Sequence, residues 1–136
     1  MVVAAALADP SGQILVQQRP ASRQHGGLWE FPGGKVEPGE GPLAALAREL
    51  AEELAIAIDP ADCACLGFAA SEADDARAVV LLLYGLSQWR GMPSSQEGAA
   101  VAWVAGDALA DLAMPPLDVP LAVLAARFAR SAARDD

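Results

Sequence analysis

Cysteine and histidine are scarce in this sequence, which has 2 cysteines and 1 histidine among 136 residues. Cys63 and Cys65 are separated by one residue, so on a strand they would share a face but lie too far apart for easy bridging. We interpret them as small buried apolar residues. With no other cysteine and a single loop histidine, His25, the sequence offers neither a disulfide framework nor a zinc site.

Positive charge is also scarce, because 9 Lys and Arg stand against 18 Asp and Glu, giving a formal net charge of −9. An acidic protein repels the phosphates of a nucleic-acid backbone, so we expect no polynucleotide partner. Small anionic substrates remain compatible with this charge if metal ions screen their phosphates.

Long hydrophobic runs are missing, since none approaches the roughly 20 residues that span a bilayer. Residues 1–8 are apolar, lack a basic start and stop at Asp9-Pro10, which predicts a strand rather than a signal peptide. We therefore expect no membrane partner and a reducing, cytoplasmic location.

The sequence does contain enough apolar residues for a core, at 54% hydrophobic and 20% charged. We expect a single domain over residues 1–136. Periodicity and turn residues predict strands over 2–7, 14–18, 63–70, 78–86 and 99–104, a helix over 43–54, a short helix capped by Asp107, and a last helix from Pro120. The first two strands are predicted to form a hairpin, and 78–86 a central strand. This order favours an α+β fold.

The stretch from Gly34 to Ile56 carries the most informative pattern. Glu49, Glu52 and Glu53 stand at i, i+3 and i+4, which places them on one face of a helix. Crowded carboxylates cannot all stay ionised without a positive charge among them, and a divalent cation would supply it. The opposite face would bury an apolar stripe made of Leu43, Leu46, Ala47, Leu50 and Leu54. The alternative is a solvated acidic helix face.

The spacing Gly34-x5-Glu40-x7-Arg48-Glu49-Leu50-x-Glu52-Glu53 resembles the signature of the Nudix hydrolases. The resemblance covers nearly the whole chain and implies an α/β/α sandwich with a mixed β-sheet. One position departs from the family, which usually has glycine where this chain has Ala55. Glycine there would suit a left-handed helix C-cap, and alanine in that conformation costs about 1 kcal/mol.

The resemblance implies a catalytic Mg²⁺ site, with Mn²⁺ as an alternative cofactor. Glu49, Glu52 and Glu53 would bind the metal together with the carbonyl of Gly34, since Mg²⁺ prefers oxygen ligands. Arg48 would orient a catalytic glutamate, and it is also placed for a helical ion pair with Glu52.

Two further glutamates have roles that the sequence leaves open. Glu40 is expected to cap or brace the loop rather than bind metal. Glu97 resembles the extra glutamate that in MutT-type members reaches the metal or helps to activate water. The alternative for Glu97 is a solvated loop carboxylate.

Substrate contacts are implied for Arg19, Gln24 and Arg77, which match MutT-type contact positions. Phe31 lies next to the metal loop and would contact a sugar or base, or would pack in the core. Asp118 matches the base-reading position of the MutT-type motif, where MutT has asparagine. Because an ionised aspartate only accepts hydrogen bonds, it suits an exocyclic amino group of cytosine or guanine. Its alternative role is an N-cap for the last helix.

These features together predict a Mg²⁺-dependent, MutT-like hydrolase that converts a nucleoside triphosphate to monophosphate and pyrophosphate. Its role would be to remove oxidised or modified nucleotides such as 8-oxo-dGTP. CTP or a modified dCTP is the alternative substrate, and a non-catalytic Nudix-like nucleotide-binding module is the alternative class. We expect a monomer or a weak homodimer.

Overall fold

The computed structural model describes residues 1–23, 25–71, 78–96 and 100–134. Its strands are β1 (Val2–Leu7), β2 (Gln13–Gln18), β3 (Trp29–Glu30), β4 (Gly33–Lys35), β5 (Ala64–Ala70), β6 (Val80–Leu86) and β7 (Val101–Ala105). Its helices are α1 (Pro42–Leu54) and α2 (Asp118–Arg134), with short 3-10 helices η1 (Pro60–Asp62) and η2 (Gly106–Asp111).

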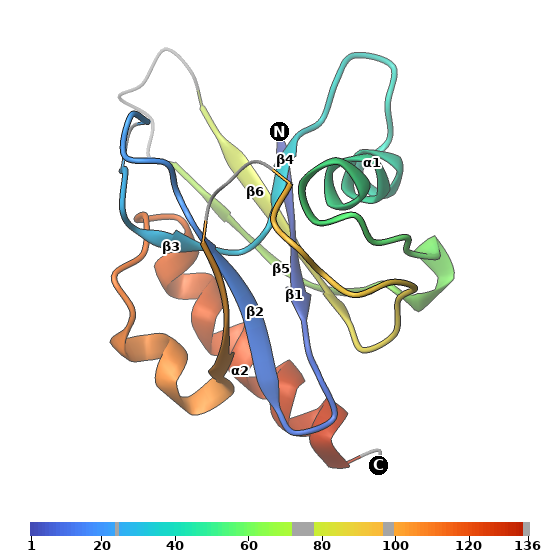
Figure 1. Ribbon diagram of the computed structural model, residues 1–136. Coiled ribbons are helices and arrows are strands. Elements are labelled where there is room, and N and C mark those ends of the chain that lie inside the picture. Colours follow the sequence, from blue (N-terminus) through green and yellow to red (C-terminus); the bar gives the residue numbers. More distant parts are fainter. Residues whose placement is uncertain (24, 72–77, 97–99, 135–136) are drawn as a thin grey trace.

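The strands form two sheets, a 4-stranded sheet in the order β4-β1-β6-β5 and a 3-stranded sheet in the order β3-β2-β7 (Figure 1). β1 runs parallel to β6, whereas the other pairs are antiparallel. β6 lies inside its sheet, between β1 and β5, which confirms that the Val- and Leu-rich segment is a central strand. The predicted mixed sheet is likewise confirmed.

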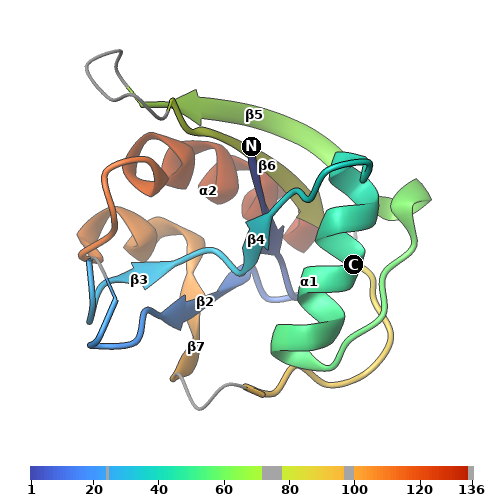
Figure 2. The same cartoon turned by 90° about the horizontal axis from the view of Figure 1, so that it is seen from above.

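The two long helices cover opposite faces of the strands (Figures 1 and 2). Side chains along β1 alternate between them because successive residues of a strand point to opposite faces. Val3, Ala5 and Leu7 pack in the cluster that contains the buried leucines of α1, and Ala4 and Ala6 pack in the cluster that contains α2. The predicted α/β/α sandwich is therefore confirmed.

Helix α1 forms where the sequence predicts it. Pro42 opens the helix, at a position where a missing N–H removes no intrahelical bond. Leu46, Leu50 and Leu54 are fully buried at helical spacing and fix the helix to the sheet. Ala55 ends it at φ 59° and ψ 35°, in the left-handed conformation that favours glycine.

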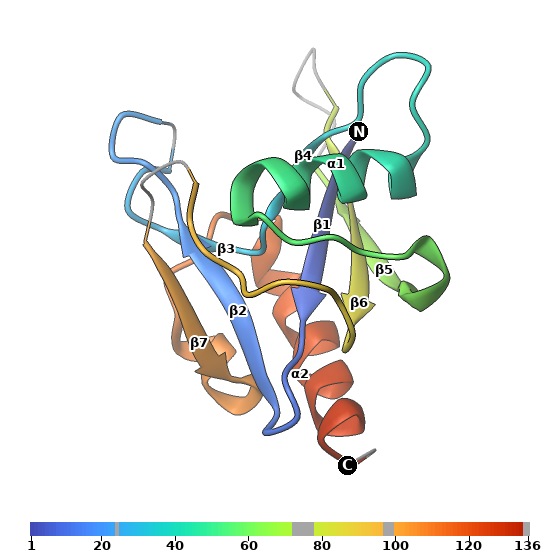
Figure 3. The same cartoon turned by 45° about the vertical axis from the view of Figure 1, so that its right-hand side comes forward.

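The predicted hairpin of β1 and β2 is wrong beyond its turn. The two strands belong to different sheets and share one isolated bridge, between Ala8 and Ile14. Figure 3 shows them diverging from the turn that joins them. The reason is that both edges of each strand are already paired, β1 with β4 and β6, and β2 with β3 and β7.

Three smaller expectations also need correction. Asp107 caps no helix, since η2 has no side-chain cap and the Asp107 carboxylate lies 3.5 Å from Arg130. α2 begins at Asp118 rather than Pro120. Cys65 is exposed and Cys63 only half-buried, so neither is the buried apolar residue that was expected. Among the described helices, none has the length and apolar character needed to cross a membrane.

Candidate active site

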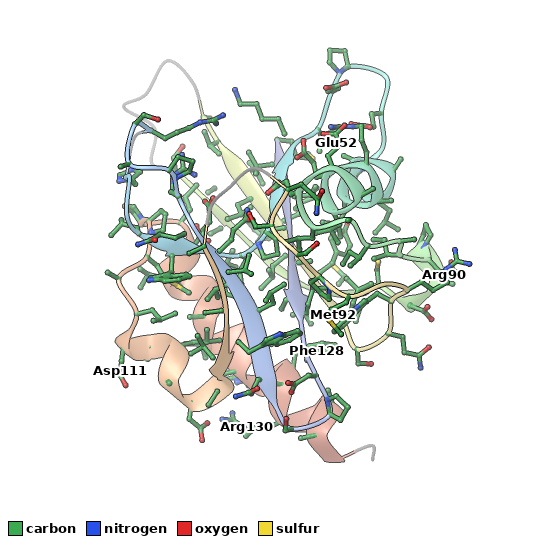
Figure 4. The ribbon with its side chains drawn as sticks, in the orientation of Figure 1. Glu52, Arg90, Met92, Asp111, Phe128 and Arg130 are labelled. Carbon is green, nitrogen blue, oxygen red and sulfur yellow. The ribbon has the colours of Figure 1, made fainter. Side chains whose placement is uncertain are left out.

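Helix α1 presents its acidic residues in three different environments. Glu53 is buried, with 9% of the residue exposed, because it lies in the last turn beside Leu54 and faces the sheet. The Glu49 side chain is 17% exposed and that of Glu52 is 58% exposed. Figure 4 shows Glu52 on α1, well away from Arg130 of α2. The acidic face therefore runs from the protein interior to solvent.

Arg48 links this face to the loop that precedes α1. Its guanidinium donates to both carboxylate oxygens of Glu40, at 2.8 Å and 2.9 Å, and to the Lys35 carbonyl at 3.0 Å. The hydrogen bonds between Arg48 and Glu40 lower the pKa of Glu40 to about 2 and raise the pKa of Arg48. Glu40 thus braces the loop, in agreement with the expected role.

The same guanidinium holds two of the predicted metal ligands. Arg48 Nη1 lies 3.0 Å from Glu49 Oε1 and 3.6 Å from Glu52 Oε2. The second pair is the helical i, i+4 contact expected from the sequence. Because one nitrogen reaches both carboxylates, Arg48 keeps Glu49 and Glu52 close to each other at the surface of α1.

Gly34 lies directly against the Glu49 carboxylate. A Cβ atom at position 34 would collide with the carboxylate carbon and would lie 2.5 Å from each of its oxygens. The structure therefore brings together the backbone of Gly34 and the carboxylate of Glu49, as the sequence predicts. Glycine is needed here because of this close approach.

Glu53 contacts strand β2. Its Oε2 accepts a hydrogen bond of 2.6 Å from the side-chain amide of Gln17. As they stand, no three acidic, histidine or cysteine side chains of the described residues form a group that could hold a metal ion. The three glutamates share a helix face but do not converge on one point.

The oxygen donors of α1 and β4 nevertheless fit Mg²⁺ or Mn²⁺. Hard divalent cations prefer oxygen ligands, and these donors include a backbone segment that approaches a carboxylate without an intervening side chain. Glu49, Glu52, Glu53 and the Gly34 carbonyl are the groups that would hold such an ion. Glu49 and Glu52 would exchange contacts with Arg48 for contacts with the metal.

A second cluster surrounds the start of α2. The carboxylate of Asp118 is buried and its Oδ2 accepts a hydrogen bond from the backbone N–H of Phe31, at 3.2 Å. Burial raises the pKa of Asp118 to about 6, against the lowering effect of that hydrogen bond. Glu30, next to Phe31, forms an ion pair of 2.7 Å with Arg19. Arg19 and Asp118 thus both contact the Glu30–Phe31 segment, Arg19 through Glu30 and Asp118 through Phe31.

Comparisons with known proteins show the family of this chain. The NUDIX domain family matches residues 1–125. The chain belongs to the Nudix hydrolase family. This Nudix hydrolase is 36% identical to the CTP pyrophosphohydrolase of Escherichia coli (strain K12) over 134 residues, which is 96% of each chain. It is also 36% identical to the 8-oxo-dGTP diphosphatase of Proteus vulgaris over 98 residues, covering 72% of this chain and 85% of that relative.

Solved structures support the same assignment. The Nudix hydrolase superposes on the solution structure of the E. coli ORF135 protein with a TM-score of 0.79 and 36% identity, covering 98% of this chain and 91% of that one. A MutT structure, from work on Aliivibrio salmonicida and Vibrio cholerae, gives a TM-score of 0.70 and 27% identity, covering 99% and 97% of the two chains. The fold is therefore MutT-like.

The predicted substrate residues of this Nudix hydrolase are placed unevenly. Arg19 and Asp118 border the Glu30–Phe31 segment, as described above. The Phe31 ring is 3% exposed and packs in the core on the α2 side, so core packing accounts for the ring. Gln24, Arg77 and Glu97 lie outside the described residues.

Sequence reasoning missed Gln17 and Glu30. Gln17 shares a face of β2 with the buried Leu15, but Gln13 is polar on that face too, so the pattern does not single out Gln17. Glu30 carries no signal either, because its partner Arg19 is brought to it only by the pairing of β2 with β3.

Proposed function

We propose that this Nudix hydrolase is a Mg²⁺-dependent nucleoside triphosphate pyrophosphohydrolase, which converts a nucleoside triphosphate to monophosphate and pyrophosphate. The observation that carries the proposal is the oxygen-only face of α1, with Gly34 against Glu49 and with the Glu53 carboxylate buried beside it. Hydrolysis of a phosphoanhydride mainly requires neutralised charge and an aligned water, and a divalent metal held on this face would supply both.

The residues of the chain have distinct tasks in this proposal. Bound Mg²⁺ would screen the phosphate charge and lower the pKa of water. Arg48, fixed by Glu40, holds Glu49 and Glu52 in place, and Glu53 lines the inner end of the face. Glu97 is proposed as an additional carboxylate of the same site.

By analogy with MutT-type hydrolases, we propose that water attacks the β-phosphorus. A bond forms between the water oxygen and that phosphorus, and the bond from the β-phosphorus to the bridging oxygen of the α-phosphate breaks. The nucleoside monophosphate leaves with the bridging oxygen, and the water oxygen remains in pyrophosphate. The glutamates of α1, with Glu53 and Glu52 foremost, are the groups placed to accept the proton of the water.

The base is proposed to bind at the Arg19, Glu30 and Asp118 cluster, with Gln24 and Arg77 as further contacts. An acceptor-only carboxylate at Asp118 suits the exocyclic amino group of cytosine or of a guanine derivative. Two substrates fit this chemistry: 8-oxo-dGTP, and CTP or a modified dCTP. The second is supported by the CTP pyrophosphohydrolase of E. coli, because the match to it covers 96% of each chain. Hydrolysis of 8-oxo-dGTP or of a modified dCTP would remove damaged nucleotides before polymerases in the cytoplasm use them.

A substrate panel tests the proposal. Pyrophosphate release would be measured with CTP, dCTP, 5-methyl-dCTP, dGTP, 8-oxo-dGTP and UTP, with Mg²⁺ and with EDTA. We expect pyrophosphate and monophosphate in equal amounts, dependence on Mg²⁺, and preference for bases that carry an amino group. Release of inorganic phosphate instead, or turnover of none of the panel, would overturn the proposal.

A further inference from the structure

Gln17 lies on the side of β2 that faces α1. Leu15, two residues earlier on β2, is 1% exposed and packs in the same cluster as Leu50 and Leu54. Gln17 points to the same side, because alternate residues of a strand share a face. Its neighbour across the ladder, Val101, also packs against this cluster. An aliphatic side chain at position 17 would simply continue the core.

The Gln17 amide instead contacts the most buried glutamate of α1. Nε2 donates to Glu53 Oε2 at 2.6 Å, across 36 residues of sequence. The donor is neutral, so it directs the carboxylate without cancelling its charge, unlike Arg48 beside Glu49. An ionised carboxylate can accept about four hydrogen bonds or ligand contacts, so an amide donor and a metal can share one.

Both ends of this hydrogen bond are anchored. Gln17 lies on the central strand of its sheet, paired with Glu30 on one side and Val101 on the other. The main-chain carbonyl of Glu53 accepts a hydrogen bond of 2.9 Å from the N–H of Gln96. The bond therefore joins two fixed backbones and limits the rotamers open to the Glu53 side chain.

We infer that Gln17 is a positioning residue, which sets the direction in which Glu53 presents its carboxylate to the divalent metal. This inference rests on the proposed function, because it assumes that Glu53 is a metal ligand. Partners that orient a metal ligand typically change metal affinity by about 10- to 100-fold when they are removed. The effect is expected on metal binding itself, before any nucleotide is present.

The test compares Gln17→Met with Gln18→Met by titrating each protein with Mn²⁺ alone and measuring free Mn²⁺ by electron paramagnetic resonance. Gln17→Met keeps the length of the side chain and removes the donor. Gln18 is the matched control, since its amide donates to the Gly27 carbonyl at 3.0 Å. Circular dichroism and thermal melting would confirm the fold of each variant.

We expect Gln17→Met to raise the Mn²⁺ dissociation constant by about 10-fold or more. Gln18→Met should leave it within about twofold. Turnover of Gln17→Met should fall at low Mg²⁺ and recover at high Mg²⁺, with the KM for the nucleotide nearly unchanged. If Gln17→Met does not fold, Gln17→Asn gives the same comparison, since it withdraws the amide by one methylene.

Two results would overturn the inference, and they are distinguishable. If the parent chain binds Mn²⁺ and Gln17→Met binds it equally well, Gln17 has no role toward the metal and the proposed function stands. If the parent chain binds no Mn²⁺ yet hydrolyses nucleotides, the proposed metal site on α1 fails, and the role of Gln17 fails with it.

Discussion

Arg48 holds Glu40 through two parallel hydrogen bonds, from Nε to Oε2 at 2.8 Å and from Nη2 to Oε1 at 2.9 Å. This fork fixes direction as well as distance, so it locks the loop before α1 onto the helix. The same guanidinium holds Glu49. One arginine thus ties the structure of the loop to the position of a proposed metal ligand.

Glu40→Gln should make the free energy of unfolding fall less steeply as the pH is lowered from 4.5 to 2. The hydrogen bonds from Arg48 lower the pKa of Glu40 from 4.5 to about 2 in the folded protein. A lowered pKa means that the stabilisation is present above pH 4.5 and is lost as the pH falls toward 2. Urea unfolding at pH 2–7 would show a shallower decline for Glu40→Gln. The control is Glu37→Gln, whose exposed carboxylate lies 3.9 Å from Arg48 and should leave the curve unchanged.

Ala55→Gly should stabilise the protein. Ala55 occupies the left-handed region at φ 59°, where a Cβ atom costs roughly 1 kcal/mol. Removing it should raise the free energy of unfolding by up to about 1 kcal/mol, less the added entropy of glycine in the unfolded chain. Ala51→Gly, at an exposed position inside α1, should instead destabilise by about 1 kcal/mol. Equal losses in both variants would contradict the role of this C-cap.

Gly34→Ala should lower turnover strongly and stability only slightly. The added Cβ would displace the Glu49 carboxylate, which is the flexible end of a side chain and can move at small cost. We expect turnover to fall by about 10- to 100-fold, with a loss in unfolding free energy of about 1 kcal/mol or less. Gly41→Ala, where a Cβ meets nothing within 4 Å, is the control and should keep normal turnover. Normal turnover of Gly34→Ala would remove Glu49 from the metal site.

Asp118→Asn should change both base preference and pH dependence. Burial raises the pKa of Asp118 from 3.8 to about 6, so the charged form weakens the fold as the pH rises through this range. A neutral amide avoids that penalty, and the variant should be more stable at pH 7 by at most about 3 kcal/mol, with the difference disappearing below pH 4. Relative kcat/KM values across bases should shift, because an amide both donates and accepts hydrogen bonds whereas an ionised carboxylate only accepts them. If they stay constant while stability rises, Asp118 has a structural role only.

The parts of this fold that the sequence predicts are the local ones. The Pro42 start of α1 and its buried leucines Leu46, Leu50 and Leu54 depend on neighbouring residues, and both are found. Leu43 and Ala47 of the predicted stripe are only half-buried. The helix ends in the left-handed conformation at Ala55 although glycine is missing there. The separation of β1 and β2 into different sheets depends instead on which distant strands occupy their edges. The sequence of the turn between β1 and β2 does not indicate which distant strands pair with them.

The candidate site likewise combines contacts that neighbouring residues determine with contacts that depend on distant residues. Helical spacing predicts the Arg48–Glu52 contact, at 3.6 Å, but the shorter contact with Glu40 depends on how the loop folds back over the helix. The hydrogen bond from Gln17 to Glu53 and the ion pair of Arg19 with Glu30 need strand β2 to be placed first. Spacing therefore identified the acidic face, whereas its supports required the tertiary structure.

Turnover of Glu53→Gln tests the central claim most directly. Pyrophosphate release would be followed at saturating Mg²⁺ for the parent, for Glu53→Gln and for Asp111→Asn, an exposed control on η2. Metal ions contribute several kcal/mol to the transition state, so losing a ligand charge should lower kcat by about 10³-fold. The fold should persist, because glutamine at position 53 can still accept the hydrogen bond from Gln17. A Glu53→Gln variant with kcat within twofold of the parent would contradict the claim that α1 holds the catalytic metal.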